Sequence, residues 1–129
     1  MALGIVATTR NNMLDEITAD IGSSGNLVGY DGSRPATGGA ATTEVFTCPL
    51  SATFADPASG GVLTANSISD DTSATGGTVT WFRLETSGAA AVVDGDVGTS
   101  GSDLNLTSTT IGAGDTVSIT GLTITAGNA

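Results

Sequence analysis

The chain has 129 residues, with 13 acidic side chains, three arginines, no lysine, no histidine and one cysteine, and its formal net charge is -10. One domain is expected at this length. Without His or Lys the chain cannot form a Ser–His–Asp or Cys–His arrangement or a Schiff base, and Cys48 alone cannot build a zinc site. We therefore expect no enzyme, no metal site and no cofactor, and we interpret Cys48 as a small core residue.

The charge and the apolar pattern also limit the partners that we expect. Three dispersed arginines cannot neutralise a row of phosphates, so nucleic-acid binding is not expected. The acid excess repels anionic membranes, and no run of the sequence approaches the roughly 18 apolar residues that a membrane span needs. Residues 1–7 lack the basic region of a signal peptide. The sequence predicts a soluble protein made in the cytosol.

A single helix is predicted, over residues 9–21. Its apolar side chains follow a 3.6-residue period, at Met13, Leu14, Ile17 and Ile21. Thr9 or Asn12 could cap its start, and Gly22 would end it. The apolar stripe is interpreted as a face packed on the rest of the domain, and packing on another subunit is the alternative.

After Gly25 the pattern changes to short extended runs separated by turn residues. Strands are predicted at residues 26–30, 44–54, 62–68, 78–86, 89–94 and 117–124, with short runs near 104–106 and at 111. Pro49 marks an edge or a break in its strand, and Gly121 marks a bulge or bend. The fold class predicted is mainly β, an antiparallel β-sandwich or small barrel of about seven or eight strands with one N-terminal α-helix. Residues 1–129 would form one domain, with an arm at 1–10, the helix at 9–21 and the sandwich at 26–125.

Two acidic stretches resemble parts of cation sites. Residues 94–98 (DGDVG) begin like a calcium loop, but Gly98, Thr99 and Asn105 stand where such a loop needs a ligand, a glycine and a glutamate. Asp70 and Asp71 are adjacent, which is more typical of turn formation and capping than of cation binding. We interpret both stretches as solvated turns.

Trp81 is the most informative aromatic residue. In the predicted strand 78–86 it shares one face with Val79 and Arg83, while Phe82 and Leu84 share the other. If Phe82 and Leu84 point into the core, Trp81 points outward, and an outward Trp beside an Arg is a common composition for an interface anchor. The alternative is that Trp81 lies under the N-terminal helix in a second small core.

Several segments, taken together, resemble a known family. They are residues 9–18 (TRNNMLDEIT), 30–35 (YDGSRP), 63–68 (LTANSI), 80–83 (TWFR) and 94–106 (DGDVGTSGSDLNL). This order over nearly the whole chain resembles small virion structural proteins of tailed bacteriophages. The resemblance includes no catalytic motif. It implies a virion component, made in the host cytoplasm and assembled with the major capsid protein, another virion protein or copies of itself, with a trimer favoured.

Within that class a capsid decoration (cement) protein fits best, because such proteins are typically small, acidic, rich in β-structure and trimeric. The contact surface is expected in residues 2–21 and on the outward face of Trp81. The candidate interface residues are Leu3, Ile5, Val6, Met13, Ile17, Val79, Trp81 and Arg83. One alternative is a tail, neck or fibre module that binds host-surface glycans through Trp81 and aspartates. Another is an acidic enzyme, or an inhibitor that mimics nucleic-acid charge.

Overall fold

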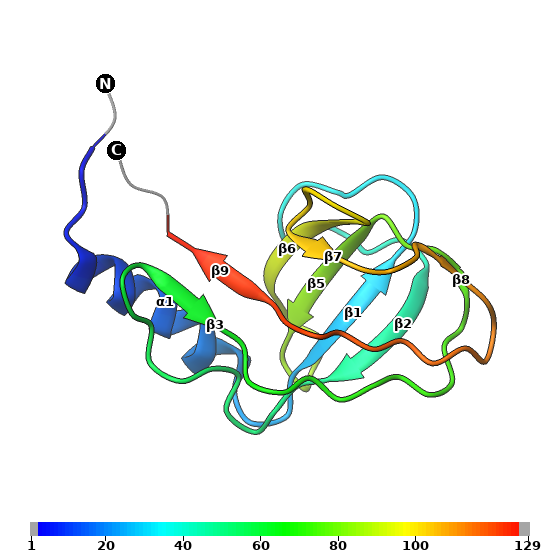
Figure 1. Cartoon of the computed structure of the whole chain (residues 1–129). Coiled ribbons are helices and arrows are strands. Elements are labelled where there is room, and N and C mark those ends of the chain that lie inside the picture. The colour runs from blue at the N-terminus through cyan, green and yellow to red at the C-terminus, as the bar shows by residue number, and fades with distance from the viewer. Residues whose placement is uncertain (1–2, 127–129) are drawn as a thin grey trace.

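The computed structural model describes residues 3–126 and shows a mainly β chain with one N-terminal helix (Figure 1). Helix α1 (Ala7–Ile21) lies at one end with strands β3 (Val62–Thr64) and β9 (Thr123–Thr125). A five-stranded sheet forms the other end. The predicted fold class is confirmed. Residues 1–2 and 127–129, which include the start of the expected arm, lie outside the described residues.

The five-stranded sheet has the order β2-β1-β5-β6-β7. Its strands are β1 (Asn26–Tyr30), β2 (Glu44–Pro49), β5 (Trp81–Glu85), β6 (Ala91–Gly98) and β7 (Leu104–Asn105). The remaining strands form two small pairs, β3 with β9 and β4 (Gly77–Thr78) with β8 (Thr110–Ile111). All pairs are antiparallel except β6 with β7. The expectation of antiparallel pairing throughout was therefore wrong at β7, where only two residues are paired and a short turn over 99–103 returns the chain.

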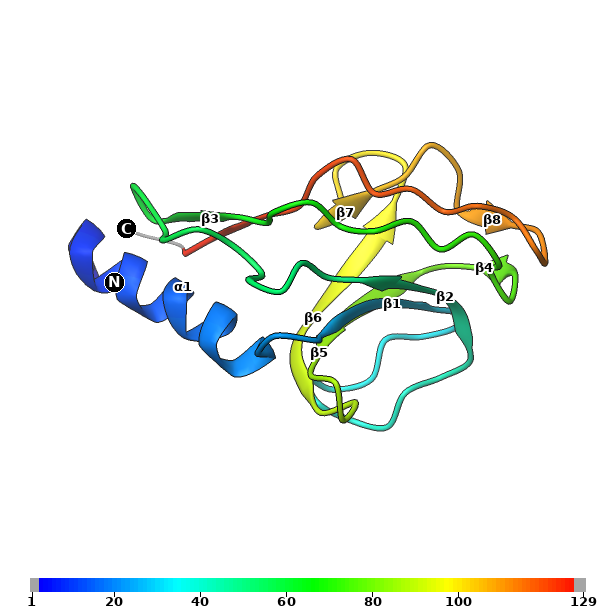
Figure 2. The ribbon, with the colours of Figure 1, turned by 90° about the horizontal axis from the view of Figure 1, so that it is seen from below.

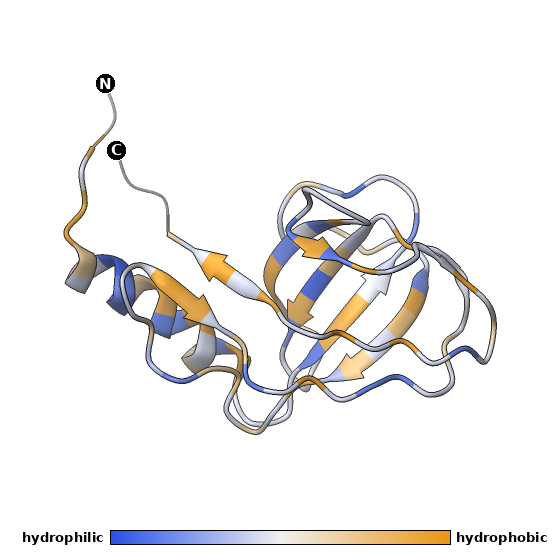
Figure 3. Ribbon diagram, viewed as in Figure 1, coloured by the Kyte–Doolittle hydropathy of each residue, from blue (hydrophilic) through white to orange (hydrophobic). Residues whose placement is uncertain are grey.

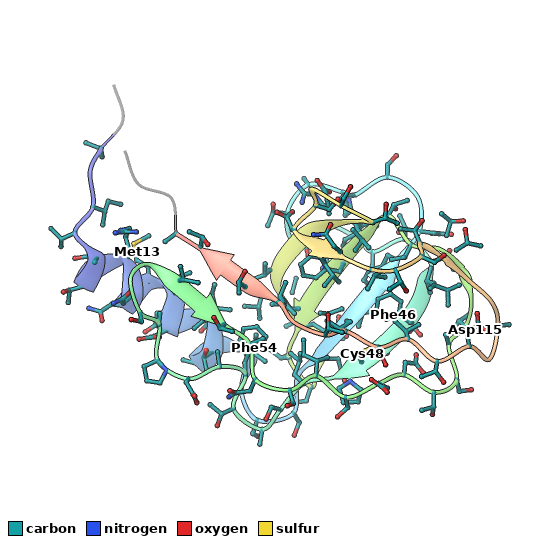
Figure 4. All side chains as sticks on the ribbon, in the orientation of Figure 1. Met13, Phe46, Cys48, Phe54 and Asp115 are labelled. Carbon is teal, nitrogen blue, oxygen red and sulfur yellow. The ribbon has the colours of Figure 1, made fainter. Side chains whose placement is uncertain are left out.

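The sheet lies between two layers of irregular chain. Figure 2 shows β7, β8 and the chain that joins β3 to β4 over one face, and the long loop of residues 31–43 under the other. We call residues 31–43 the cover loop. The main core lies on the first face and contains Leu27, Phe46 and Leu84 of the sheet. Phe46 and Cys48 belong to β2, and Phe54 lies where the sheet meets the α1 end (Figure 4).

A row of paired residues alternates between phenylalanine and glycine across four strands. Gly29 of β1 pairs with both Phe46 of β2 and Phe82 of β5, and Phe82 also pairs with Gly95 of β6. A Cβ atom at Gly29 would lie 2.3 Å from Cε1 of Phe46, and one at Gly95 would lie 2.5 Å from Cε1 of Phe82. Each ring therefore occupies the space that a neighbouring side chain would need.

Replacing Gly29 with alanine is expected to lower the free energy of unfolding by about 1–3 kcal/mol, because the buried Phe46 ring must leave its packed position. Gly88→Ala is the matched control, since its Cβ would meet nothing nearer than 3.8 Å. Denaturant unfolding of the two variants measures the difference. Equal losses of unfolding free energy in both variants would show that the packed position of the Phe46 ring does not require glycine at position 29.

Helix α1 begins earlier than predicted, because Val6, rather than Thr9 or Asn12, is its N-cap, and no side chain caps it. Its end is as predicted: Gly22 has a φ of 76°, and its N–H donates to the carbonyl of Thr18. Leu14 and Ile21 are buried and Ile17 packs against the same core. The helix stripe therefore packs on its own domain at these three positions.

The predicted strand 78–86 is divided in the structure. β4 pairs with β8, and β5 pairs with β1 and β6. Thr80 still bonds to Tyr30 and Val97, so the break lies at Val79. Val79 lies in that break, its N–H donates to the carbonyl of Thr109, and its side chain enters the main core. The expectation that Val79 shares a face with Trp81 was wrong, because strand alternation does not continue across the break.

Three other predicted strands, those at 44–54, 62–68 and 117–124, are shorter than expected, and β3 ends at Thr64. β2 ends at Pro49 and lies at the sheet edge, as the proline predicts. The edge is covered, since the N–H of Thr47 donates to Asp71 Oδ2 at 2.9 Å and the N–H of Ser69 donates to the carbonyl of Pro49. In residues 117–124 the buried side changes between Ile119 and Leu122, as expected, but through irregular chain and not through a bulge.

Candidate interaction surface

Exposed apolar side chains gather at the N-terminal end of the molecule. Leu3 is 85% exposed, Val6 70% and Met13 53%. The described chain before α1 is residues 3–6, which we call the arm, and Figure 3 shows it as largely hydrophobic. Val6 and Met13 are seven residues apart, about two helical turns, so they lie on one side of α1. Such a group of exposed apolar side chains is typical of an interaction site.

Polar contacts fix the position from which the arm leaves the body. Arg10 Nε donates to the carbonyl of Ile5 at 3.0 Å, and Arg10 Nη1 donates to the carbonyl of Ala126 at 3.5 Å. Arg10 also lies against Gly61, where a Cβ atom would be only 2.1 Å from Nη1. One guanidinium therefore joins the base of the arm to the β3–β9 end of the fold.

Two further side chains of α1 bind the turn before β3. Asp15 Oδ1 accepts the N–H of Ala58 at 2.7 Å, and Asn11 Oδ1 accepts the N–H of Gly61 at 2.8 Å. These bonds satisfy backbone donors that the two-stranded β3–β9 sheet leaves unpaired. The helix is thus held to the sheet by polar contacts on one side and by Leu14 and Ile21 on the other, while Met13 stays outside (Figure 4).

Trp81 faces away from the main core, as the alternation predicts, but it is fully buried. It forms a second small core with Val28 and Tyr30, and its contacts are with the cover loop and not with the helix. The Tyr30 and Trp81 rings are stacked with centroids 4.5 Å apart. Trp81 Nε1 donates to the carbonyl of Asp31 at 3.1 Å and to Oγ1 of Thr42 at 3.0 Å, so both ends of the cover loop contact the indole.

Arg83 holds the middle of the cover loop. Its Nε and Nη2 atoms donate to Asp94 at 2.7 and 3.0 Å, and Nη2 also donates to the carbonyl of Gly39 at 2.8 Å. Asp94 Oδ2 accepts the N–H of Gly38 at 2.9 Å. The two charged side chains are only 7% and 1% exposed, and the guanidinium carbon is 5.1 Å from the Trp81 ring centroid. The pair is a bidentate, largely buried contact between neighbouring strands.

The pKa values of this cluster follow from burial and pairing. Burial alone would raise the pKa of Asp94, but the hydrogen bonds from Arg83 and Gly38 outweigh it and hold the pKa below its ordinary value. The Asp94 contact raises the pKa of Arg83. Burial raises the pKa of the neighbouring Glu85, and the charge of Arg83 opposes that rise. Asp94 is therefore an ionised partner of Arg83.

Several of the candidate interface residues are buried inside the protein. Val79, Trp81 and Arg83 are buried, and Ile17 packs against the main core. Ile5 is half-buried at the base of the arm. The exposed candidates are Leu3, Val6 and Met13. Val79 entered the core because its strand breaks, and Trp81 and Arg83 are covered because the loop after β1 folds back over them.

The acidic stretches lie in different surroundings from those predicted. Residues 94–98 belong to β6, so the interpretation of this stretch as a solvated turn was wrong: Asp94 is buried because it faces Arg83 in the paired strand. Asp71 does act as a cap, since its carboxylate accepts the N–H groups of Thr47 and Ser73. Within residues 3–126, no three Asp, Glu, His or Cys side chains are grouped so that they could hold a metal ion.

Cys48 is a buried free thiol on β2. Burial raises its pKa to about 11, so the reactive thiolate form is rare at neutral pH. Its interpretation as a core residue is confirmed.

No helix in the described part of the chain combines the length and the apolar character that crossing a membrane requires. Comparisons with protein-family models, with curated proteins and with solved structures found no match to this chain.

Proposed function

We propose that this protein is a non-enzymatic structural component of a tailed-bacteriophage virion, and that it acts as a capsid decoration (cement) protein. The observation that carries the proposal is the arm, where Leu3 and Val6 are exposed at the end of an otherwise well-packed β domain. The resemblance of the sequence to phage virion proteins supplies the class of partner. The arm would contact the major capsid protein, and the acidic side chains would keep copies soluble before assembly.

Repeated contacts suit such a role. A decoration protein stabilises a shell by burying additional surface at many equivalent places, and each contact can be small. Two aliphatic side chains and Met13 provide a limited apolar surface, which is consistent with many weak, equivalent contacts.

The glycan-binding alternative depended on Trp81 as an exposed platform. Trp81 and Tyr30 are buried under the cover loop, so this face offers no aromatic surface for stacking on a sugar. A position on the tail, neck or fibre remains the alternative to a position on the head.

The number of copies per particle tests the location. Mass spectrometry of purified virions of the encoding phage should detect the protein at hundreds of copies, as expected for a lattice component. A handful of copies would place it on the tail, neck or fibre, and absence from the particles would overturn the proposal.

Replacing Leu3 and Val6 together with serine is expected to reduce attachment and leave the fold intact. Burying one such side chain contributes about 1.5–3 kcal/mol, so the double variant should lose about 3 kcal/mol or more of attachment free energy per copy. Serine is a favoured N-cap residue, so at Val6 it should not lower the free energy of unfolding, and at the exposed Leu3 the change should stay below about 0.5 kcal/mol. Occupancy on particles, measured by quantitative imaging, checks the first expectation and denaturant unfolding the second.

Deletion of residues 1–10 would be a less specific test than the serine variant. It would remove the first turn of α1, which starts at Ala7, and it would remove Arg10, which lies against Gly61 and donates to the carbonyl of Ala126. Ala90→Ser, at an exposed position beside β6, is the matched control and should attach as the unchanged protein does. Full occupancy of the Leu3→Ser/Val6→Ser protein would show that the arm is not the attachment surface.

A further inference from the structure

The curled β-structure is open along one side. Among residues 3–126, β9 pairs only with β3, while β6 pairs with β5 and, at its last two residues, with β7. Between them lies a cleft of about 190 Å³, bordered by residues 94–95 of β6 and by β9. We call this cleft the seam. Phe82, Val93 and Leu122 line it from the main core, so its floor is apolar.

The β9 side of the seam is a free strand edge. The N–H of Ala65 donates to the carbonyl of Leu122, and the N–H of Ala126 donates to the carbonyl of Gly61. In an antiparallel pair the bonded residues alternate, so residues 122, 124 and 126 face β3. The N–H and C=O groups of Thr123 and Thr125 therefore point away from β3, and both residues border the seam.

The β6 side has a free edge at one residue. The N–H of Val97 donates to the carbonyl of Thr80, and the register Phe82↔Gly95 continues that ladder. Residues 93, 95 and 97 thus face β5, while Asp94 and Asp96 direct their backbone groups outward. The N–H of Asp96 is taken by Asp103 Oδ2 at 2.9 Å. The backbone groups of Asp94 are left facing the seam, without a hydrogen-bond partner among residues 3–126.

We propose that the arm of a second copy of this chain inserts into the seam as an additional β-strand, pairing with the outward backbone groups of β9 and of Asp94. Insertion of an extended segment at free strand edges is a general mode of recognition, in which backbone bonds give affinity and alternate side chains enter pockets. Leu3 or Val6 would cover the floor formed by Phe82, Val93 and Leu122.

Charge favours the arm over other surfaces of a second copy. The chain carries a net charge of -10, and Asp94 and Asp103 border the seam. Like-charged surfaces repel one another on approach. Residues 3–9 carry no charged side chain and include the two most exposed large apolar residues, Leu3 and Val6. Val6 already has extended backbone angles, with φ -62° and ψ 149°.

The arm and the seam are different surfaces of one chain. Two copies can exchange arms reciprocally in a two-fold dimer, or more copies can close into a ring. An arm that lies in the seam of a second copy is not available to the major capsid protein, so the inference concerns self-association in solution before attachment. It is tested without particles and can therefore fail or hold separately from the proposed function.

Disulfide trapping tests the contact directly. Leu3→Cys and Thr123→Cys, made in separate chains of different mass and mixed under oxidising conditions, are expected to form a crosslinked heterodimer in several-fold higher yield than Leu3→Cys with Thr72→Cys. Thr72 is an exposed control away from the seam. Cys48 can stay in both chains, because it is buried and its pKa is about 11. Equal yields with Thr123→Cys and with the control would overturn the proposal.

A proline variant tests the backbone pairing. Thr125→Pro removes an N–H that faces the seam and none that faces β3, so it should weaken association about tenfold relative to Thr125→Ala, as the loss of a well-formed hydrogen bond predicts. Sedimentation over a concentration series measures association, and circular dichroism verifies the fold of both variants. A monomer at every concentration would overturn the proposal. So would a disulfide within one chain in Leu3→Cys/Thr123→Cys, since the arm would then occupy its own seam.

Discussion

Replacing Phe82 with alanine is expected to lower the free energy of unfolding by about 3–5 kcal/mol. The ring is buried in the main core and pairs with Gly29 on one side and Gly95 on the other. Neither glycine has a side chain that could move into the space, so the cavity left by alanine cannot be filled from within the row. The loss should therefore lie toward the upper end of this range.

Denaturant unfolding with an unchanged m-value measures that loss. Phe82→Leu is the control, because it keeps most of the apolar volume and should cost less than about 1.5 kcal/mol. A loss below about 1 kcal/mol for Phe82→Ala would mean that the opposite face of β5 carries the core.

Replacing Arg83 with methionine is expected to lower the free energy of unfolding by about 3–5 kcal/mol, because it leaves the Asp94 carboxylate buried without its charged partner. The change also removes the donor to Gly39, so the cover loop should separate from Trp81. Trp81 is the only tryptophan in the chain. A red-shifted emission maximum and greater quenching by acrylamide would report its exposure.

The matched control is Arg34→Met. The Arg34–Asp96 pair joins the same loop to the same strand at 3.4 Å, but its side chains are 38% and 61% exposed, and exposed pairs contribute at most about 1 kcal/mol. Equal losses of unfolding free energy in the two methionine variants would show that the buried Arg83–Asp94 pair contributes no more to stability than the exposed Arg34–Asp96 pair.

The same pair gives a pH dependence of defined sign. Because the pKa of Asp94 is lowered in the folded protein, its contribution is present above the unfolded value of about 3.9 and is lost as pH falls through the folded value. The stability gap between the unchanged protein and Arg83→Met should therefore narrow as pH falls. Asp94 of the variant, buried without Arg83, takes up its proton first, and Asp94 of the unchanged protein follows below about pH 4. The raised pKa of Glu85 acts in the opposite direction, so Glu85→Gln in both proteins isolates the Asp94 contribution.

Local signals in the sequence predicted local structure. Gly22 ends the helix because its left-handed φ is available to glycine at low cost, and Pro49 ends an edge strand because it lacks an N–H. Strand alternation predicted that Phe82 and Leu84 face the main core, and they do. The start of α1 was not predictable in this way, since Val6 is not a capping residue type.

Long-range packing determined the features that local sequence signals did not predict. The direction of Trp81 followed from alternation, but its burial depends on the cover loop. That loop is held because Trp81 donates to Thr42 and Arg83 donates to Gly39, pairs that are 39 and 44 residues apart in the sequence. The length of that loop was a usable signal, because ordered loops of this length are uncommon without a specific role. Leu3 and Val6 were predictable as exposed candidates since they precede the periodic helix pattern, whereas the break at Val79 has no distinct local signal.

The alternation of phenylalanine and glycine across the sheet has an evolutionary consequence. At each step of the row, a phenylalanine ring fills the space beside a glycine. A larger residue at Gly29 is therefore tolerable only together with a smaller one at Phe46, and a larger residue at Gly95 only with a smaller one at Phe82. Among descendants of this chain, these positions should change together or not at all. The row would then be inherited as a unit, even where the surrounding surface diverges freely.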